Sequence, residues 1–378
     1  LRNELRVKRM TLDDVLVNLV VYEDEYFMNV LDLFGSHNED DTDDKKKFDS
    51  KVHIEDFNLS KGHIVVWNQN KDKPEKLSMD YGHLDIDSIY MSANSLSFVD
   101  GVITGNLNNL SAAEKSGFVL DEFSSKSKFT VSSKGFEFKN LVLNSHETYL
   151  DLDLQFVYNN YRSFLTFVDS IMIIANIRPS QLTLSDLKYF SPTMGKMTDT
   201  LQIKGNITGT VTDFTANNFE FSFKDSTNFL GTIRMKGLPN FFETHIVGHV
   251  EKMNFTYQDI SEFAIPTPDR KIPIPENLVT LKNALLSGEF YGFHNNFKTT
   301  FNLYTNLGNI FIDGNLNNDL LTVSTPNYKF ALYANNLKVN DIVGMKNDMT
   351  LTLSADVSGE GFNKESADID MNFEIDKF

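Results

Sequence analysis

The sequence contains no cysteine, and this absence excludes three kinds of chemistry together. A disulfide framework, a thiolate metal site and a cysteine nucleophile each need a thiol. The lack of cysteine fits an oxidising envelope compartment, although many cytosolic chains lack cysteine as well. The lack of cysteine therefore restricts the chemistry that the protein can perform more than it restricts the compartment in which the protein lies.

Positive charge is also scarce. The 378 residues include 35 lysines and arginines against 52 acidic residues, which gives a formal net charge of −17. A nucleic-acid-binding protein needs a concentrated basic surface to neutralise phosphates, and direct adhesion to anionic bilayers needs one too. The composition argues against both, so we expect no nucleic-acid partner.

Long hydrophobic runs are missing as well. The longest candidate, VLVNLVVY from Val15, has the length of a strand, so we expect no helix of this sequence to span a membrane. The sequence opens on Leu1 instead of methionine, and no charged segment with an apolar core follows it. We expect a fragment of a longer protein, with any anchor or targeting signal upstream.

What the chain has in abundance is alternation of apolar and polar residues. Hydrophobic residues make up 41% of the sequence and include 32 phenylalanines, so the apolar faces are bulky. From Val52 onward, alternating segments are joined by Asn, Asp, Gly, Ser and Lys turns, which predicts an all-β chain of about twenty strands. Glycine recurs inside these strands, as in IKGNITGTV, and indicates strong curvature, bulges or close backbone approach. We therefore expect a long, strongly curled continuous sheet with a few short helices.

The expected organisation has four stretches. Residues 1–48 hold two short strands, a helical turn around Glu25 to Phe34 and an acidic flexible loop, and residues 49–264 hold the β repeats. The segment IPTPDRKIPIP at 265–275 is too rich in proline for an interior strand or a helix, so it is predicted to be a seam. Residues 276–378 continue the repeats.

Two segments within the repeats predict short helices. TLSDLKYFSP near Thr183 and TYQDISEFAIP near Thr256 each place a hydroxyl residue before an acidic first turn and end at a proline. The acidic run from Glu39 to Asp44 is a different case, because it lacks the glycine that a calcium loop needs at its turn. We expect a solvated loop there.

Paired carboxylates in YLDLDLQFVY are the first candidate for a chemical site. Asp151 and Asp153 lie on one side of a predicted strand, about 7 Å apart, a spacing at which they could share a cation or a proton. Only His146 and Glu147 are near them in sequence as further ligands. A solvated strand face is the favoured interpretation.

Other catalytic and metal-binding patterns are weak. His245 and His249 in THIVGHV would suit zinc on a helix, but on the strand that the segment predicts they lie about 13 Å apart. The glycine motifs neither open a helix nor carry a phosphate-binding lysine, and no nucleophile elbow stands out. We expect no catalytic residue, no metal and no cofactor, and so no enzyme.

The apolar side of the predicted sheet needs a cover. Each Leu or Phe left facing water forgoes about 1.5–3 kcal/mol of burial. A continuous one-sided sheet therefore holds an apolar ligand along its groove, or closes the groove with its own side chains. The pattern alone leaves both alternatives open, and alternation of this kind is more often plain core than ligand surface.

An ordered series of segments resembles a known family. These segments are NLNNLSAAEKSGFVLDEFSSK, KGFEFKNLVLNSHETYLDLDLQFVY, IRPSQLTLSDLKYFSP, LQIKGNITGTVTDFTANNFEF and GTIRMKGLPNFFETHIVGHVEKMNFTYQDI. Their order over residues 50–262 is similar to that in the Bacteroidetes-type relatives of TamB, the translocation and assembly module component of the AsmA-like family. The remaining residues continue the same repeat.

The resemblance implies a fold and a role. The fold is a β-taco, a long curled sheet with an apolar interior groove. Such proteins are anchored in the inner membrane by an N-terminal helix, cross the periplasm and meet an Omp85-family barrel in the outer membrane. They are implicated in phospholipid transport and outer-membrane biogenesis. The anchor and the barrel-contacting domain are not in this sequence, so contacts with either membrane fall outside it.

The leading hypothesis is thus a periplasmic conduit in which phospholipid acyl chains lie along the groove, with head groups at its open edge. The alternative is a non-catalytic scaffold that assists outer-membrane protein assembly through strand-edge contacts and carries no lipid. The predicted groove residues are Leu150, Leu152, Leu154, Phe156, Ile203, Ile207, Val211, Phe219, Phe221, Phe223, Ile233 and Met235.

Overall fold

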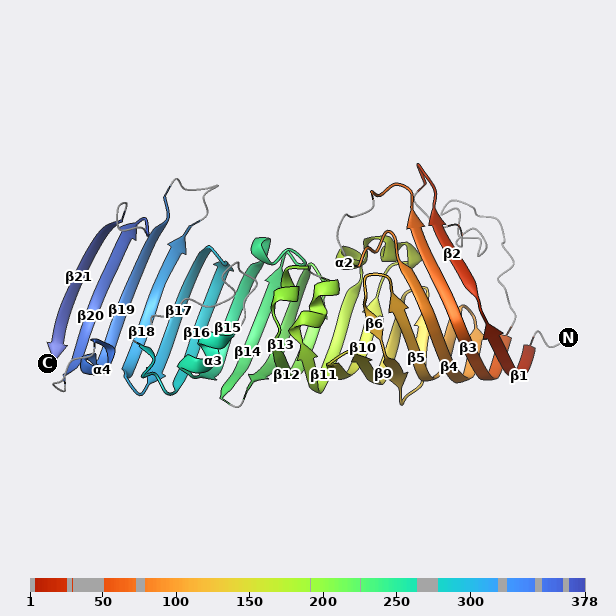
Figure 1. The fold of residues 1–378 in the computed structure, drawn as a ribbon, viewed down its shortest axis with the longest axis horizontal. Helices are drawn as coiled ribbons and strands as arrows, with labels where there is room; N and C mark the ends of the chain where they lie inside the picture. The colour runs from red at the N-terminus through yellow and green to blue at the C-terminus, as the bar shows by residue number, and fades with distance from the viewer. Residues whose placement is uncertain are drawn as a thin grey trace. The chain divides into compact units, whose positions relative to one another are not determined.

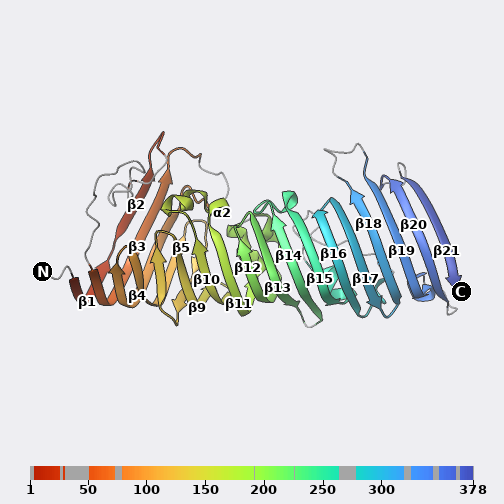
Figure 2. The same ribbon diagram turned by 180° about the vertical axis from the view of Figure 1, so that it is seen from behind.

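The computed structural model describes residues 4–25, 29, 51–72, 79–190, 192–224, 226–263, 278–318, 325–343, 349–362 and 367–377. The acidic run Glu39 to Asp44, the proline-rich segment 265–275 and most of the helical turn predicted around Glu25 to Phe34 lie outside these residues. The described part contains 21 strands and a few short helices (Figures 1 and 2), which confirms the all-β prediction.

The chain divides into two compact units. Unit 1 comprises Leu1–Gly195 and Ile207–Val211, and unit 2 comprises Lys196–Asn206 and Thr212–Phe378. Unit 1 contains β1 (Glu4–Asp13), β2 (Leu16–Val21), β3 (Lys51–Asn68), β4 (Asp85–Val99), β5 (Val102–Glu114), β6 (Val119–Leu120), β7 (Glu122–Ser125), β8 (Phe129–Ser132), β9 (Gly135–Ser145), β10 (Thr148–Val157), η1 (Tyr161–Thr166), α2 (Phe167–Ser170), β11 (Met172–Thr183) and η2 (Leu184–Tyr189).

Unit 2 holds the remaining elements, and η3 (Pro192–Lys196) and β12 (Thr200–Gly209) have residues in both units. Unit 2 contains β13 (Asp213–Phe223), β14 (Thr227–Lys236), η4 (Phe241–Glu243), β15 (His245–Phe255), α3 (Tyr257–Glu262), β16 (Ala284–Phe293), β17 (Asn296–Thr305), β18 (Gly308–Asn317), β19 (Asn327–Lys338), α4 (Val339–Val343), β20 (Thr350–Glu360) and β21 (Asp368–Lys377).

Unit 1 has a mixed sheet. β1 and β2 both run parallel to β3, with Glu4 opposite Lys51 and Leu16 opposite His63. The other ladders are antiparallel and join β3 to β4, β4 to β5, β5 to β6 and β8, β9 to β7 and β8, and then β9, β10 and β11 in order. The sequence did not predict the parallel pairing, because alternation shows which face a residue takes but not which strand lies beside it.

Unit 2 has a simpler antiparallel order. From β13 to β21 each strand pairs with the next one in the chain (Figures 1 and 2). The registers place apolar residues on one side, which we call the apolar face of unit 2, as in the row Phe301, Ile312 and Leu332. The opposite side, the polar face of unit 2, carries residues such as His249 and Glu289, which are opposite one another.

Glycines on the apolar face of unit 2 lie against aromatic rings of the neighbouring strand. A Cβ atom at Gly288 would lie 2.8 Å from Cδ1 of Phe301, and the φ of +143° at Gly288 disfavours any other residue. Close approach of this kind is one of the three explanations that the glycine pattern left open. The rings use the space that a side chain would otherwise fill.

Both predicted short helices are present. The Thr256 hydroxyl accepts a hydrogen bond from the backbone N–H of Asp259 at 3.1 Å and caps α3. The segment after Thr183 forms η2, a 3₁₀ helix whose N-cap side chain makes no capping hydrogen bond. No helix in the described ranges is long and apolar enough to cross a membrane.

Candidate functional site

A cavity of about 390 Å³ opens on the apolar face of unit 2. Its lining comes from three neighbouring strands, because the registers place Leu316 opposite Tyr328 and Phe330 opposite Val357. Phe362, just after β20, completes the lining and stacks on the Tyr328 ring at a centroid distance of 5.7 Å. The lining side chains are hydrocarbon except for one phenol, so the cavity suits an apolar occupant.

The apolar side chains of β21, on the same face, are exposed in the described part of the chain. Ile369, Met371, Phe373 and Ile375 alternate along β21 and are 53%, 55%, 66% and 48% exposed. They belong to the apolar face, because Phe373 lies opposite Ala355 on β20. β21 pairs with no other described strand than β20. A contiguous apolar stripe of this kind marks a surface that meets lipid, ligand or protein.

In unit 1, part of the apolar side of β9 and β10 is covered by the chain itself. The rings of Phe136 on β9 and Phe156 on β10 lie 4.6 Å apart, and the short helices η1 and α2 add two more rings. Phe164 stacks on Phe136 at 6.3 Å, and Phe167 meets Phe156 edge-on at 5.7 Å. Unit 1 therefore has an aromatic core at β9 and β10 that needs no ligand to exclude water.

The predicted groove residues are divided between the two units. In unit 1, Leu150, Leu152, Leu154 and Phe156 share one side of β10, with Ile207 on β12 and Val211 just after it. In unit 2, Phe219, Phe221 and Phe223 lie on β13, Ile233 and Met235 on β14, and Ile203 on β12. Leu152, Ile203 and Phe223 are buried, and the others are half-buried. Cross-strand pairs such as Phe221 with Phe229 place the β13 and β14 members on the apolar face of unit 2.

The residues around the cavity and along β21 are not among those that the sequence pattern predicted as groove residues. The alternation in DIDMNFEID carries a clear signal for the exposed stripe. The cavity has no such signal, because it depends on the registers of three strands and on the placement of Phe362 after a turn.

The carboxylates of Asp151 and Asp153 are held by one arginine. Arg178 on β11 donates from Nε and Nη2 to Oδ1 of Asp151 at 2.8 and 2.6 Å, and from Nη1 to Oδ1 of Asp153 at 3.0 Å. Oδ1 of Asp153 also accepts the backbone N–H of Asn140 at 2.8 Å. Partial burial alone raises the pKa of Asp153, but the hydrogen bonds from Asn140 and Arg178 outweigh it and hold that pKa below its ordinary value of 3.8. The pair therefore forms an ion-paired link between β10 and β11.

The two histidines weighed as zinc ligands both lie on strand β15. His249 projects to the polar face of unit 2, where its Nδ1 is 3.6 Å from Oε1 of Glu289. The ring of His245 packs edge-on against the Tyr291 ring at 4.6 Å. Across the described ranges, no three His, Asp or Glu side chains form a group suited to a metal ion.

Comparison with known proteins adds no relative. No family model, no curated protein and no solved structure matches this chain.

Proposed function

We propose that this chain is the periplasmic part of a TamB-like, AsmA-type protein that carries phospholipid acyl chains along an apolar β groove between the inner and outer membranes. In this proposal the sheet curls around its apolar side as a β-taco. The inner membrane and an Omp85-family barrel are its partners through segments beyond this sequence. The protein has no catalytic role in this proposal.

The observation that carries the proposal is the apolar face of unit 2. Its cavity of about 390 Å³ is lined by Leu316, Tyr328, Phe330, Val357 and Phe362. The nearby stripe on β21 exposes Phe373 by 66%. An acyl chain laid on such a surface gains about 0.8 kcal/mol for each CH₂ group removed from water. A lipid on this face would remove apolar side chains of the described residues, such as Phe373, from water, while its polar head group stays in water.

Lipid extraction of the purified chain tests the proposal. The protein is expressed in the periplasm of a Gram-negative host, purified without detergent, and analysed by native mass spectrometry and by extraction of bound lipid. We expect co-purified phospholipid, held in amounts that track protein concentration. A chain that is free of phospholipid and takes up none from vesicles contradicts the conduit.

The scaffold remains the second candidate function, and two observations favour it. The aromatic rings of Phe164 and Phe167 cover Phe136 and Phe156 on β9 and β10 of unit 1 without a ligand. Among the described strands β21 pairs with β20 alone, so its other edge is suited to strand addition, by a following segment of this chain or by a partner chain. A lipid-free chain that binds an unfolded outer-membrane protein through β21 would establish this alternative.

A further inference from the structure

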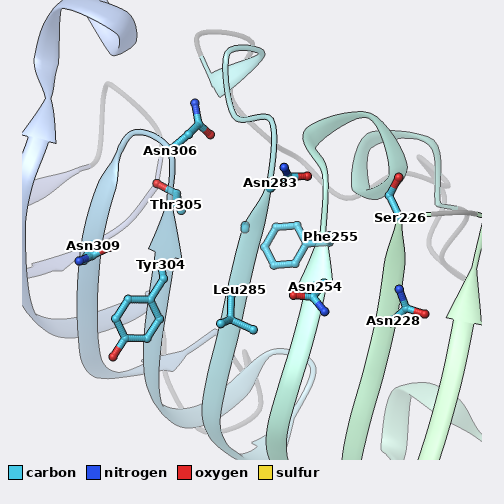
Figure 3. Close-up of a pocket in the computed structure, with 11 residues that line it drawn as sticks. Ser226, Asn228, Asn254, Phe255, Asn283, Leu285, Tyr304, Thr305, Asn306 and Asn309 are labelled. Carbon is cyan, nitrogen blue, oxygen red and sulfur yellow. The ribbon is translucent and has the colours of Figure 1, made fainter.

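A second hollow, of about 500 Å³, lies on unit 2 at the ends of strands β14 to β18 (Figure 3). A row of residues that are opposite one another in successive ladders forms its floor: Asn228, Asn254, Leu285, Tyr304 and Asn309. This row belongs to the polar face of unit 2. The site is thus separate from the apolar cavity, and the inference does not depend on the proposed lipid transport.

The hollow is polar without being charged. None of the described residues that line the hollow has a side chain that is charged at neutral pH. Its polar groups are instead side-chain amides and hydroxyls, which both donate and accept hydrogen bonds. An anion would find no counter-charge there, and the net charge of −17 on the chain opposes it further.

Several of these amides are available to a ligand. Asn254, Asn283 and Asn309 make no side-chain hydrogen bond with any described residue, and Figure 3 shows them around the hollow. Asn228 uses only its carbonyl oxygen, which accepts a hydrogen bond from Oγ of Ser222 at 2.8 Å. Four amide groups at one site thus keep hydrogen-bonding capacity for hydroxyl groups.

The amide of Asn306 is not available to a ligand, because both of its ends are hydrogen-bonded to the backbone. Its Oδ1 accepts the backbone N–H of Lys282 at 2.9 Å, and its Nδ2 donates to the carbonyl oxygen of Thr280 at 3.0 Å. These two bonds fix the segment that carries Asn283 against the turn after β17. The rim of the hollow is therefore held in place before any ligand arrives.

Two aromatic rings line the hollow, the half-buried Phe255 and the exposed Tyr304. The Tyr304 side chain is 49% exposed and lies between Leu285 and Asn309 in the row of paired residues. Two more exposed rings continue from it across the polar face. Phe311, two residues beyond Asn309 on β18, lies opposite Tyr333 on β19, and these side chains are 37% and 44% exposed. Exposed rings beside a polar sheet surface offer flat apolar contact next to hydrogen-bonding groups.

We propose that this hollow binds a neutral sugar ring, and that the rings of Phe311 and Tyr333 extend the site toward an oligosaccharide. A sugar ring has an apolar C–H face, which fits the exposed Tyr304 ring, and hydroxyl groups around its edge, which fit the free amides. It has no charge, which matches the uncharged lining. The ligand is either a soluble glycan or the sugar head group of a glycolipid.

Titration of the whole chain with defined glycans tests the assignment. Isothermal titration calorimetry with maltohexaose, cellohexaose and chitohexaose covers soluble glycans. Flotation with phosphatidylcholine vesicles, with and without digalactosyl diacylglycerol, covers the lipid-borne source. We expect at least one of these sugars to bind, and Tyr304→Ala and the double variant Asn254→Ala with Asn283→Ala each to weaken that binding by about tenfold or more.

Tyr291→Ala is the matched control, because Tyr291 is a 57% exposed tyrosine on the same polar face and is not part of the hollow. It should leave sugar binding unchanged, and circular dichroism should show that every variant is folded. Three outcomes would overturn the assignment: no binding of any of these sugars at about 10 mM, binding that survives Tyr304→Ala at full affinity, or an equal loss in Tyr291→Ala.

Discussion

Gly314 on β18 lies directly against the ring of Phe330 on β19, and a Cβ atom at Gly314 would be 2.8 Å from Cγ of that ring. It would also be 2.5 Å from the carbonyl oxygen of Lys329, which moves only if the strand moves. Phe330 lines the apolar cavity, so the absence of a side chain at Gly314 determines the position of one ring of the cavity lining. The packing of backbone against ring is therefore part of how the apolar face is shaped.

Gly314→Ala should destabilise unit 2 for this reason. The added methyl group displaces Phe330 and the neighbouring backbone, and overpacking of this kind costs about 1–3 kcal/mol. Gly248→Ala on β15 is the matched control, because the nearest atom to its Cβ would be Cβ of Phe290, at an ordinary 3.8 Å. Urea unfolding of the two variants should show a clear loss for the first and almost none for the second. Equal midpoints would contradict the packing described for Gly314.

Asp153→Asn should change how the stability of unit 1 depends on pH. The pKa of Asp153 is lowered in the folded state, so its link to Arg178 and Asn140 contributes stability above the unfolded pKa of 3.8 and loses it as the pH falls through the folded value. Because the side chain is 39% exposed, solvent screening keeps the contribution to about 1 kcal/mol or less.

The free energy of unfolding, measured between about pH 6 and pH 2, should therefore fall more steeply in the parent chain than in the Asp153→Asn variant. Asp356→Asn on β20 serves as the control, since Asp356 is exposed and makes no ion pair with a described residue. The plot of unfolding free energy against pH for Asp356→Asn should run parallel to that of the parent chain. A parallel pair of curves for Asp153→Asn and the parent would show that the link contributes nothing.

Phe164→Ala should loosen the cover over unit 1. The ring of Phe164 contacts those of Phe136 and Tyr158 at centroid distances of 6.3 and 5.0 Å, so its loss uncovers the aromatic core. For a half-buried ring we expect a loss of about 1–3 kcal/mol in the free energy of unfolding. Phe311→Ala, at an exposed ring on the polar face of unit 2, should stay within about 0.5 kcal/mol of the parent. Similar losses in both variants would mean that the helices do not act as a cover.

The sequence predicted which side of a strand each of these residues takes, but it did not predict which strands lie beside one another. The alternation in YLDLDLQFVY places Leu152 and Asp153 on opposite sides of β10, and the structure confirms this arrangement. The helix cap at Thr256 could also be predicted from the sequence, because a cap depends on residues three positions apart. What the pattern did not contain was Arg178, which lies 25 positions from Asp153 and reaches it only through the pairing of β10 with β11.

The same limit applies to the candidate site. Leu152 was predicted to line a groove, and it lies on the expected face, but it is only 6% exposed because Leu141 and Ile177 flank it on the neighbouring strands. Further along the same strand, Phe156 is covered by the ring of Phe167, which comes from a later part of the chain. Whether an apolar face is core or ligand surface depends on such covering segments, and alternation within a strand carries no information about them.

Phe373→Glu should reduce phospholipid binding without unfolding the chain, because Phe373 is 66% exposed on β21. Asn372→Glu is the matched control: it introduces the same charge one residue away, on the opposite face of the same strand. The amount of phospholipid that co-purifies with each variant, divided by the amount of protein, is the measurement. We expect a several-fold decrease for Phe373→Glu alone. A decrease of the same size in both would point to charge near the strand edge instead of acyl-chain contact.

The most direct test of the lipid-carrying face places a photo-crosslinking phenylalanine analogue at Phe330 or at Tyr333. Both positions carry aromatic rings on β19, but Phe330 lines the apolar cavity and Tyr333 lies on the polar face, 44% exposed. After illumination in cells, mass spectrometry of the purified protein should show phospholipid attached at position 330 and not at position 333. Crosslinks to phospholipid at neither position, or equally at both, would contradict the proposal that this face carries acyl chains.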